Sequence, residues 1–219
     1  MKFILDAGHA LTGAVGAQAN GYKEEVEARK IVSAVEQKLK SLGHKVVIAS
    51  CDHEANANKQ LQRIVAVANN HKDADLFISV HFNAFEDPKA NGVEVYSYSK
   101  KGKGHEFAVD IQDELVKLGF TDRKKKEAGF YVLRHTICPA VLIETAFLTN
   151  ADDMKKLNVD KVSSAIVKAV TGTEIAYKDD VPKQQMFRVV AGTYTNRQNA
   201  EIMQKKLKEK GFDSFLTIV

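Results

Sequence analysis

The sequence has few of the features that mark secreted or membrane-spanning proteins. Its only two cysteines, Cys51 and Cys138, are far apart and form no CxxC pair. A disulfide-stapled secreted domain or a thiolate metal site would need more cysteines, so neither is predicted. Cys138 is expected to be a small buried side chain rather than a nucleophile. The longest apolar runs, such as residues 139–143, are far shorter than the ~20 residues that cross a bilayer.

The first residues do not look like a secretory leader. A signal peptide needs an apolar stretch of ~7–15 residues, and here Asp6 interrupts the run that begins at Phe3. We therefore expect synthesis in the cytoplasm without a signal peptide. The net charge is +4 at pH 7. This mild excess suits anionic polymers, among them wall glycan, teichoic acid and nucleic acid, but it selects none of them.

Strand-like and helix-like segments alternate over residues 1–171. The helical spacing is clear from Glu24 to Leu42, and Gly43 follows as a helix stop. Strands are expected over residues 2–6, 45–49, 76–80, 92–96, 130–133 and 140–144, and helices over residues 24–42, 61–70, 105–118 and 152–170. This alternation predicts an α/β fold in which a twisted, mostly parallel sheet is flanked by helices.

A smaller unit is expected at the C-terminal end. Residues 172–184 have no apolar period and are predicted to be a linker. Residues 185–219 are predicted to form a β-α-β unit, with strands over residues 186–191 and 212–219 and a helix over residues 196–210 between them. Such a unit is too small to bury a core alone. Its helix would place Ala200, Met203 and Leu207 on one side, so we expect it to need a partner surface, and a homodimer would supply one.

Three polar side chains come where predicted strands of the larger unit end: His9, His81 and Glu144. The carboxyl ends of parallel strands meet at one edge of a sheet, which is where sites form in open α/β folds. A lone histidine is more often a structural residue than a ligand. Two histidines and a carboxylate at one edge favour a functional site.

A second carboxylate lies near His9 in the chain, at the start of the first predicted helix. Glu24 and Glu25 both occupy this turn, where a glutamate is common because it stabilises the helix dipole. We prefer Glu24 as the functional residue because it lies four residues before Ala28, on the apolar face of the helix.

Zinc would explain the four polar residues together. His9, Glu24 and His81 would supply three ligands and leave one position for water, as in catalytic zinc sites. Zinc lowers the pKa of such a water to ~7, and Glu144 would take and return its proton as a general base. The sequence contains no HExxH or CxxC motif, so the residue pattern alone leaves zinc as a hypothesis.

Three stretches of the sequence carry a family resemblance: ILDAGHALTGAVGAQANGYKE, DLFISVHFNA and GFYVLRHTICPAVLIETAFLTN. In this order they resemble the zinc-dependent N-acetylmuramoyl-L-alanine amidases of the amidase type 3 family, over residues 1–170. The resemblance implies a compact α/β domain with one zinc that hydrolyses the amide between N-acetylmuramic acid and L-alanine of the peptidoglycan stem peptide. It also implies that His9, Glu24 and His81 are zinc ligands and that Glu144 is the catalytic glutamate.

The sequence departs from the family pattern near the first histidine. The family usually has the motif D-P-G-H-G-G there, whereas Ala7 and Ala10 stand in place of a proline and a glycine. Some members insert a regulatory helix before the catalytic glutamate. Here residues 83–143 are fully used by predicted elements, so we expect an uncovered site. Within this segment, Asn83 and Arg134 are candidates for substrate contacts.

The tail FRVVAGTYTNRQNAEIMQKKLKEKGFDSFLTIV resembles one half of a sporulation-related (SPOR-like) wall-binding repeat. Together the two resemblances imply bacterial peptidoglycan, and not nucleic acid, as the partner. A phage or prophage endolysin that reaches the wall after lysis or through a holin-type pore is the favoured interpretation. The alternatives are a mother-cell autolysin of a sporulating bacterium, a catalytically dead wall-binding protein and a zinc peptidase acting on ordinary peptides.

Overall fold

The structure of the chain is a computed structural model that describes residues 1–177, 191–212, 214 and 216. It divides into two compact units, Met1–Asp180 and Val181–Val219. Among the described residues, none of the helices combines the length and the apolar character that crossing a membrane would require.

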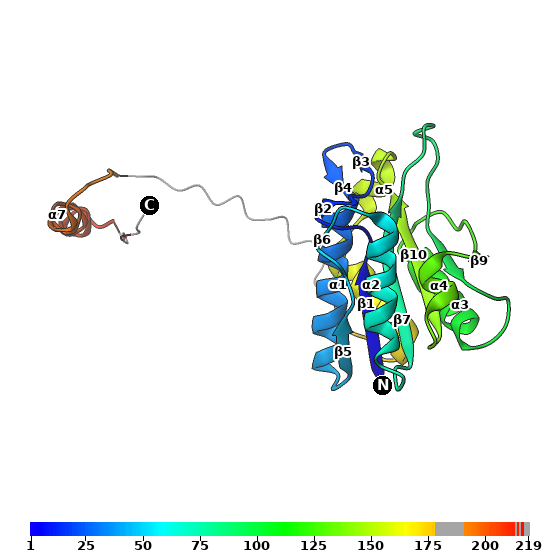
Figure 1. The fold of residues 1–219 in the computed structure, drawn as a ribbon. Helices are drawn as coiled ribbons and strands as arrows, with labels where there is room; N and C mark the ends of the chain where they lie inside the picture. Colours follow the sequence, from blue (N-terminus) through cyan, green and yellow to red (C-terminus); the bar gives the residue numbers. More distant parts are fainter. Residues whose placement is uncertain (178–190, 213, 215, 217–219) are drawn as a thin grey trace. The chain divides into compact units, whose positions relative to one another are not determined.

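A six-stranded sheet forms the centre of the first unit, with the strand order β5-β1-β7-β10-β8-β9 (Figure 1). The strands are β1 (Lys2–Ala7), β5 (Lys45–Ile48), β7 (Leu76–Asn83), β8 (Glu94–Ser97), β9 (Lys126–Glu127) and β10 (Ala140–Phe147). All neighbouring strands run parallel except β8 and β10, which are antiparallel. The predicted α/β fold with a mostly parallel sheet is confirmed.

Helices cover both faces of this sheet. The helices of this unit are α1 (Glu24–Ser41), α2 (Ala57–Asn69), α3 (Lys103–Val116), α4 (Tyr131–His135), α5 (Ala151–Lys156) and α6 (Val159–Thr171). Successive side chains of β1 enter different cores, because side chains alternate along a strand. Phe3 and Leu5 pack in a cluster with α1, α3 and α6, whereas Ile4 packs in a second cluster with α2 and α4.

Short two-residue strands complete the first unit: β2 (Thr12–Gly13), β3 (Gln18–Ala19), β4 (Tyr22–Lys23) and β6 (His53–Glu54). β2 pairs with β6, and β3 pairs with β4 as a small hairpin. The hairpin leads directly into α1, so it fixes where the first residues of that helix lie. These short pairs were not predicted from the sequence, because two residues leave no readable period.

The strand predicted over residues 130–133 is wrong: this segment is the short helix α4. Its aromatic and β-branched residues favour a strand locally. Tertiary packing overrides that preference, since Val132 and Leu133 are buried in the cluster with α2. The side chain of Asn69, at the end of α2, also accepts a hydrogen bond from the backbone N–H of Ile137 (3.0 Å) just beyond the helix.

The single helix predicted over residues 152–170 is also wrong, because two helices, α5 and α6, occupy this segment. The break falls at Leu157 and Asn158. The Asn158 side chain accepts a hydrogen bond from the backbone N–H of Lys161 (2.9 Å) and so caps a new helix. An asparagine inside an apolar helical period was the signal for this break.

Both cysteines are free. Cys51 is buried and Cys138 is partly buried. Burial raises the pKa of the Cys138 thiol to about 11, so the thiolate form that acts as a nucleophile is scarce at neutral pH.

The described part of the second unit contains the helix α7 (Arg197–Glu209), close to the predicted span of residues 196–210. The Asn196 side chain caps it by accepting from the backbone N–H of Gln198 (2.8 Å). No residue of α7 is buried. The strand predicted over residues 186–191 lies outside the described residues except for Ala191, which is not in a strand. Most of the strand predicted over residues 212–219 also lies outside them.

Candidate active site

The predicted site residues lie at the carboxyl-terminal edge of the central sheet. His81 and Glu144 are register partners in the parallel strands β7 and β10. His9 follows the end of β1 by two residues, and Glu24 is the first residue of α1. Three parallel strands and one helix N-terminus therefore bring four residues from separate parts of the chain to one edge, as ligand sites in open α/β sheets require.

His9, Glu24 and His81 form a compact cluster. One ligand atom from each residue lies within 4.8 Å of the other two. The two oxygens of Glu24 are divided between the imidazoles: Oε1 lies 2.9 Å from Nδ1 of His81, and Oε2 lies 3.2 Å from Nε2 of His9. The two rings meet edge to face with centroids 5.0 Å apart.

The backbone around this cluster is shaped for close approach. His9 has a φ of 65°, a left-handed conformation that is uncommon for a residue other than glycine and that concentrates at functional sites. A Cβ atom on Gly8 would lie 2.2 Å from the His81 ring, and one on Gly16 would lie 2.6 Å from Oε2 of Glu24. Both positions therefore require glycine.

The charges of the cluster suit a cation. Burial disfavours a charged Glu24, but hydrogen bonds from His81 and His9 outweigh this and hold its pKa well below its usual range. Burial likewise opposes a charged His81, yet its hydrogen bond with Glu24 raises the pKa of His81 to about 9. The same negative environment that holds a proton on the imidazole favours a metal cation in its place.

Zinc fits this donor set. Two imidazole nitrogens and one carboxylate oxygen are the ligand types of a three-residue catalytic zinc site. Glu25 does not join the cluster, although it is also buried. Its Oε2 instead accepts a hydrogen bond from the backbone N–H of Gly16 (3.3 Å). The geometry therefore favours Glu24 over Glu25 as the ligand carboxylate.

Behind the cluster lies a residue that sequence reasoning did not single out. Asp6 is 1% exposed and accepts a hydrogen bond from the Ser79 hydroxyl (2.7 Å). Burial raises the pKa of Asp6, an effect opposed by the Ser79 hydrogen bond and by the nearby His81. Asp6 lies between the buried apolar residues Leu5 and Ala7 of β1, so a polar residue within a buried apolar run was the available signal.

Glu144 lies next to His81 across the sheet and has no hydrogen-bond partner for one oxygen. Oε2 of Glu144 is buried, and no described residue donates to it. Burial raises the pKa of Glu144 to about 7; His81 opposes this rise, and Glu24 and Glu94 add to it. A carboxylate with a pKa near neutrality can accept a proton and give it back at the operating pH.

The strand that carries Glu144 is irregular just after it. Glu144 pairs with His81 and Phe147 pairs with Asn83, so β10 contains one residue more than β7 over this interval. Such a bulge is common beside active sites, where it sets the direction of a side chain.

The two candidate substrate residues lie in different surroundings. Asn83 is partly buried, and its amide donates to Oε1 of Glu94 (2.9 Å), so it is engaged with a protein carboxylate. Arg134 is exposed in α4. Their contribution to substrate binding stays a prediction.

Glu94 was missed by sequence reasoning. It is the register partner of Glu144 on β8 and is 4% exposed. Its carboxylate accepts hydrogen bonds from Asn83, Tyr96, Arg123 and Lys126. Burial disfavours the charged form, but these donors outweigh it and lower the pKa of Glu94 to about 2. Alternation along a four-residue strand gave no sign of this role.

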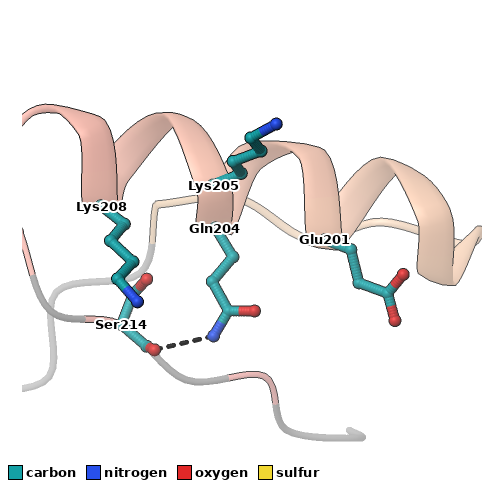
Figure 2. Close-up of a pocket in the computed structure, with 5 residues that line it drawn as sticks. All are labelled: Glu201, Gln204, Lys205, Lys208 and Ser214. Atoms are coloured by element: carbon teal, nitrogen blue, oxygen red, sulfur yellow. Dashed lines mark hydrogen bonds between the residues drawn. The ribbon is translucent and has the colours of Figure 1, made fainter.

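A separate depression lies on α7, lined by Glu201, Gln204, Lys205, Lys208 and Ser214 (Figure 2). The Gln204 amide donates to the backbone carbonyl of Ser214 (2.8 Å). The depression is lined by no histidine or cysteine and by one carboxylate and two lysines, so it offers no catalytic set comparable to the residues at the edge of the sheet.

The arrangement at the sheet edge could hold a divalent metal ion beside a buried carboxylate, which is the equipment of a metal-dependent hydrolase. Comparisons with known proteins agree. A family model described as N-acetylmuramoyl-L-alanine amidase matches residues 3–173. The chain belongs to this N-acetylmuramoyl-L-alanine amidase family and is a peptidoglycan amidase, which confirms the predicted enzyme class.

Individual relatives support this assignment. The chain is 29% identical to the N-acetylmuramoyl-L-alanine amidase CwlM of Bacillus licheniformis over 99% of this chain and 84% of that protein. It is 37% identical to the endolysin of Bacillus phage SPP1 over 71% of this chain and 58% of that protein. Among solved structures, the catalytic domain of the CD27L endolysin targeting Clostridia Difficile superposes with a TM-score of 0.73 and 28% identity, covering 80% of this chain and 99% of that one.

The SPOR domain model matches residues 151–217. Its first part overlaps the amidase match, and in the structure those residues form α5 and α6, which belong to the first unit. The predicted SPOR-like character of the tail is thus confirmed by the family match. The predicted domain bounds of 1–171, 172–184 and 185–219 stay a prediction.

Proposed function

We propose that this amidase cleaves the bond between N-acetylmuramic acid and L-alanine with one zinc ion held by His9, Glu24 and His81, and with Glu144 as the general base. The observation that supports it most is the convergence of the three ligand atoms within 4.8 Å. One of the three residues, His81, is the register partner of Glu144, whose buried Oε2 has no partner among the described residues.

Bound zinc would supply Lewis-acid chemistry, polarising the amide carbonyl and making a water molecule more acidic. Glu144 accepts a proton as that water attacks the carbonyl carbon, and its pKa of about 7 suits this role at neutral pH. Glu144 then delivers the proton to the alanine nitrogen as the carbon–nitrogen bond breaks. The products are a muramoyl carboxylate and a peptide with a free L-alanine amino terminus.

The experiment that tests the function is digestion of purified cell walls by the full chain loaded with zinc. We expect new L-alanine amino termini and free muramoyl carboxyl ends in equal amounts. Amino termini of other residues would indicate a zinc peptidase, and the absence of any new ends would indicate a catalytically dead wall-binding protein.

Within this activity, we place the protein as a phage or prophage endolysin, made in the cytoplasm and reaching the wall after lysis or through a holin-type pore. The similarity to the endolysin of Bacillus phage SPP1 supports this assignment. The alternative, a mother-cell autolysin, is supported by 27% identity to a sporulation-specific amidase of Bacillus subtilis. Transcript measurements decide between them: an endolysin gene responds to prophage induction, and a mother-cell autolysin gene responds to sporulation.

The tail would add wall binding, as the SPOR match suggests, and self-association. On α7, the predicted inner side chains Ala200, Met203 and Leu207 are only partly covered, and Ile202 is 54% exposed. A second copy of the unit would cover this surface and supply the other half of the repeat. Light scattering on the full chain tests this: a monomer at high concentration rules out the homodimer.

A further inference from the structure

The surface next to Glu144, on the side away from the histidines, is formed by Glu94 and its partners. Glu144 has two register partners, His81 on β7 and Glu94 on β8. Register partners point their side chains to the same face of a sheet, about 4.5–5.5 Å apart. Glu94 therefore extends the row of functional side chains by one strand beyond Glu144.

Two cations hold a single oxygen of this buried carboxylate. Nε of Arg123 lies 3.0 Å from Oε2 of Glu94, and Nζ of Lys126 bonds the same oxygen. Oε1 is occupied by Asn83 and by the Tyr96 hydroxyl. One negative charge thus faces two positive charges, which leaves a formal charge of +1 on this group. One cation would have been enough to neutralise Glu94.

The two cations that carry this excess positive charge are partly exposed, and some of their hydrogen-bond donors have no acceptor among the described residues. The side chains of Arg123 and Lys126 are 35% and 38% exposed, whereas that of Glu94 is 5% exposed. A guanidinium has five N–H donors and an ammonium has three. Among the described residues, Arg123 bonds Glu94 and the Asn91 carbonyl, and Lys126 bonds only Glu94, so further donors remain for a ligand.

Both cations are held in place before any ligand arrives. The Arg123 guanidinium lies over the Phe147 ring, 4.8 Å from its centroid, and its backbone N–H donates to the Val93 carbonyl (3.1 Å). Lys126 pairs with Tyr96 across β8 and β9, and its ammonium lies 5.9 Å from the Tyr96 ring centroid. Such preorganisation lowers the entropy cost of binding an anion.

We propose that Arg123 and Lys126, positioned by Glu94, bind a carboxylate on the second residue of the stem peptide. The inference rests on the proposed function, in which Glu144 marks the scissile amide. Glu144 is separated from the two cations by one strand spacing, to Glu94, and by one hydrogen bond from Glu94 to each cation. This distance is roughly the length of two extended peptide residues, so the cations would reach the second residue of the stem peptide. A bidentate guanidinium with an ammonium beside it matches the charge and geometry of a carboxylate.

The test compares two muramoyl-peptides that differ only in whether the second residue bears an α-carboxylate or a carboxamide. We expect the zinc-loaded full chain to cleave the carboxylate substrate with a kcat/KM about tenfold higher or more, since hydrogen bonds to charged groups are the strong ones. In Lys126→Gln and Arg123→Gln this preference should shrink through a higher KM for the carboxylate substrate, with the carboxamide substrate little changed. Lys126→Arg should restore most of it.

Lys155→Gln is the matched control, because Lys155 is a 78%-exposed cation on α5 that pairs with Asp152 and not with Glu94. It should leave the preference intact. Equal cleavage of both substrates by the wild type overturns the inference while leaving the proposed function standing. Equal losses on both substrates in Lys126→Gln also overturn it, because they would show that the cations only support Glu94. No cleavage of either substrate overturns the proposed function and the inference together.

Discussion

Glu144 and Glu94 are neighbours across the sheet, yet their surroundings are opposite. Glu144 has an oxygen without a partner among the described residues and a pKa raised by burial to about 7. Glu94 accepts four hydrogen bonds, and its pKa is lowered to about 2. The same residue type can thus serve as a proton carrier or as a fixed anion, and the donors around it decide which.

The largest loss of activity is expected when the proposed zinc ion beside Glu144 is removed. A chelator should abolish activity and added zinc should restore it, and His81→Ala should lower the zinc content because a catalytic site usually needs three protein ligands. Elemental analysis beside wall hydrolysis checks both. His44→Ala is the control, since His44 precedes β5 at the opposite edge of the sheet. Full activity of a metal-free preparation would contradict the mechanism.

The next largest effect is a difference in kcat between variants of the two glutamates. Glu144→Gln keeps the shape but cannot accept a proton, so kcat should fall ~10²–10⁴-fold, as general acid–base catalysis requires, with zinc retained. Glu94→Gln should leave the chemical step far less affected. Steady-state kinetics with zinc stoichiometry on both variants tests this. Similar losses of kcat in the two variants would show that Glu144 and Glu94 do not differ in their contribution to the chemical step.

A third experiment concerns which carboxylate of α1 serves the metal. Glu24→Ala should lose bound zinc, because Glu24 bonds both imidazoles. Glu25→Ala should keep it, since Glu25 contacts the Gly16 backbone instead. Zinc stoichiometry after dialysis decides the matter. Loss of zinc from Glu25→Ala with retention in Glu24→Ala would reverse the ligand assignment.

A smaller effect concerns stability on the Glu94 side. A carboxylate whose pKa is lower in the folded protein than in the unfolded chain stabilises the folded protein. For Glu94 this contribution is fully present at pH values above the unfolded pKa of about 4.5, and it is lost as the pH falls toward 2. Glu94→Gln should therefore lower the free energy of unfolding by on the order of 2 kcal/mol at pH 7. The difference should be roughly 1 kcal/mol smaller at pH 4.

Urea denaturation of the wild type and of Glu94→Gln at pH 7 and pH 4 measures this difference. Glu86→Gln is the control, because Glu86 is an exposed glutamate that follows β7. A difference that does not change with pH would show that Glu94 contributes through packing rather than through its charge.

The smallest effect is expected from removing the tail. A chain ending at Thr171, the last residue of α6, should retain zinc and cleave small muramoyl-peptides at a normal rate. It should bind intact walls less well, because two linked binding sites gain through effective concentration. Wall pelleting assays beside kinetics check this. Loss of activity on small substrates would show that the tail supports the catalytic unit.

The sequence was enough to predict where the candidate metal-binding cluster lies. His9, His81 and Glu144 each come at the end of a strand that is recognisable from its apolar run, and parallel strands end at one edge. Glu24 could be preferred over Glu25 only through the helical face it shares with Ala28. The structure brings the predicted residues together, and their catalytic roles stay predictions.

The Glu94 group could not be predicted, because its donors come from segments far apart in the chain. Asn83 lies on β7, Tyr96 lies on β8, and Arg123 and Lys126 come from the loop and short strand after α3. No local period links them. The error at α4 has a related cause, since the helix depends on packing against α2 that the local sequence does not reveal.

The extra residue in β10 limits which insertions and deletions this strand can tolerate. In a regular strand, residues three apart face opposite sides. The bulge lets Glu144 and Phe147 both pair with β7 residues, His81 and Asn83, that share one side. One inserted residue thus allows the Glu144 carboxyl group and the Phe147 ring, which lies beneath the Arg123 guanidinium, to occupy the same side of the sheet. Shortening β10 by one residue between them would force the chain to give up one or the other, so the length of this strand is as constrained as the identity of its glutamate.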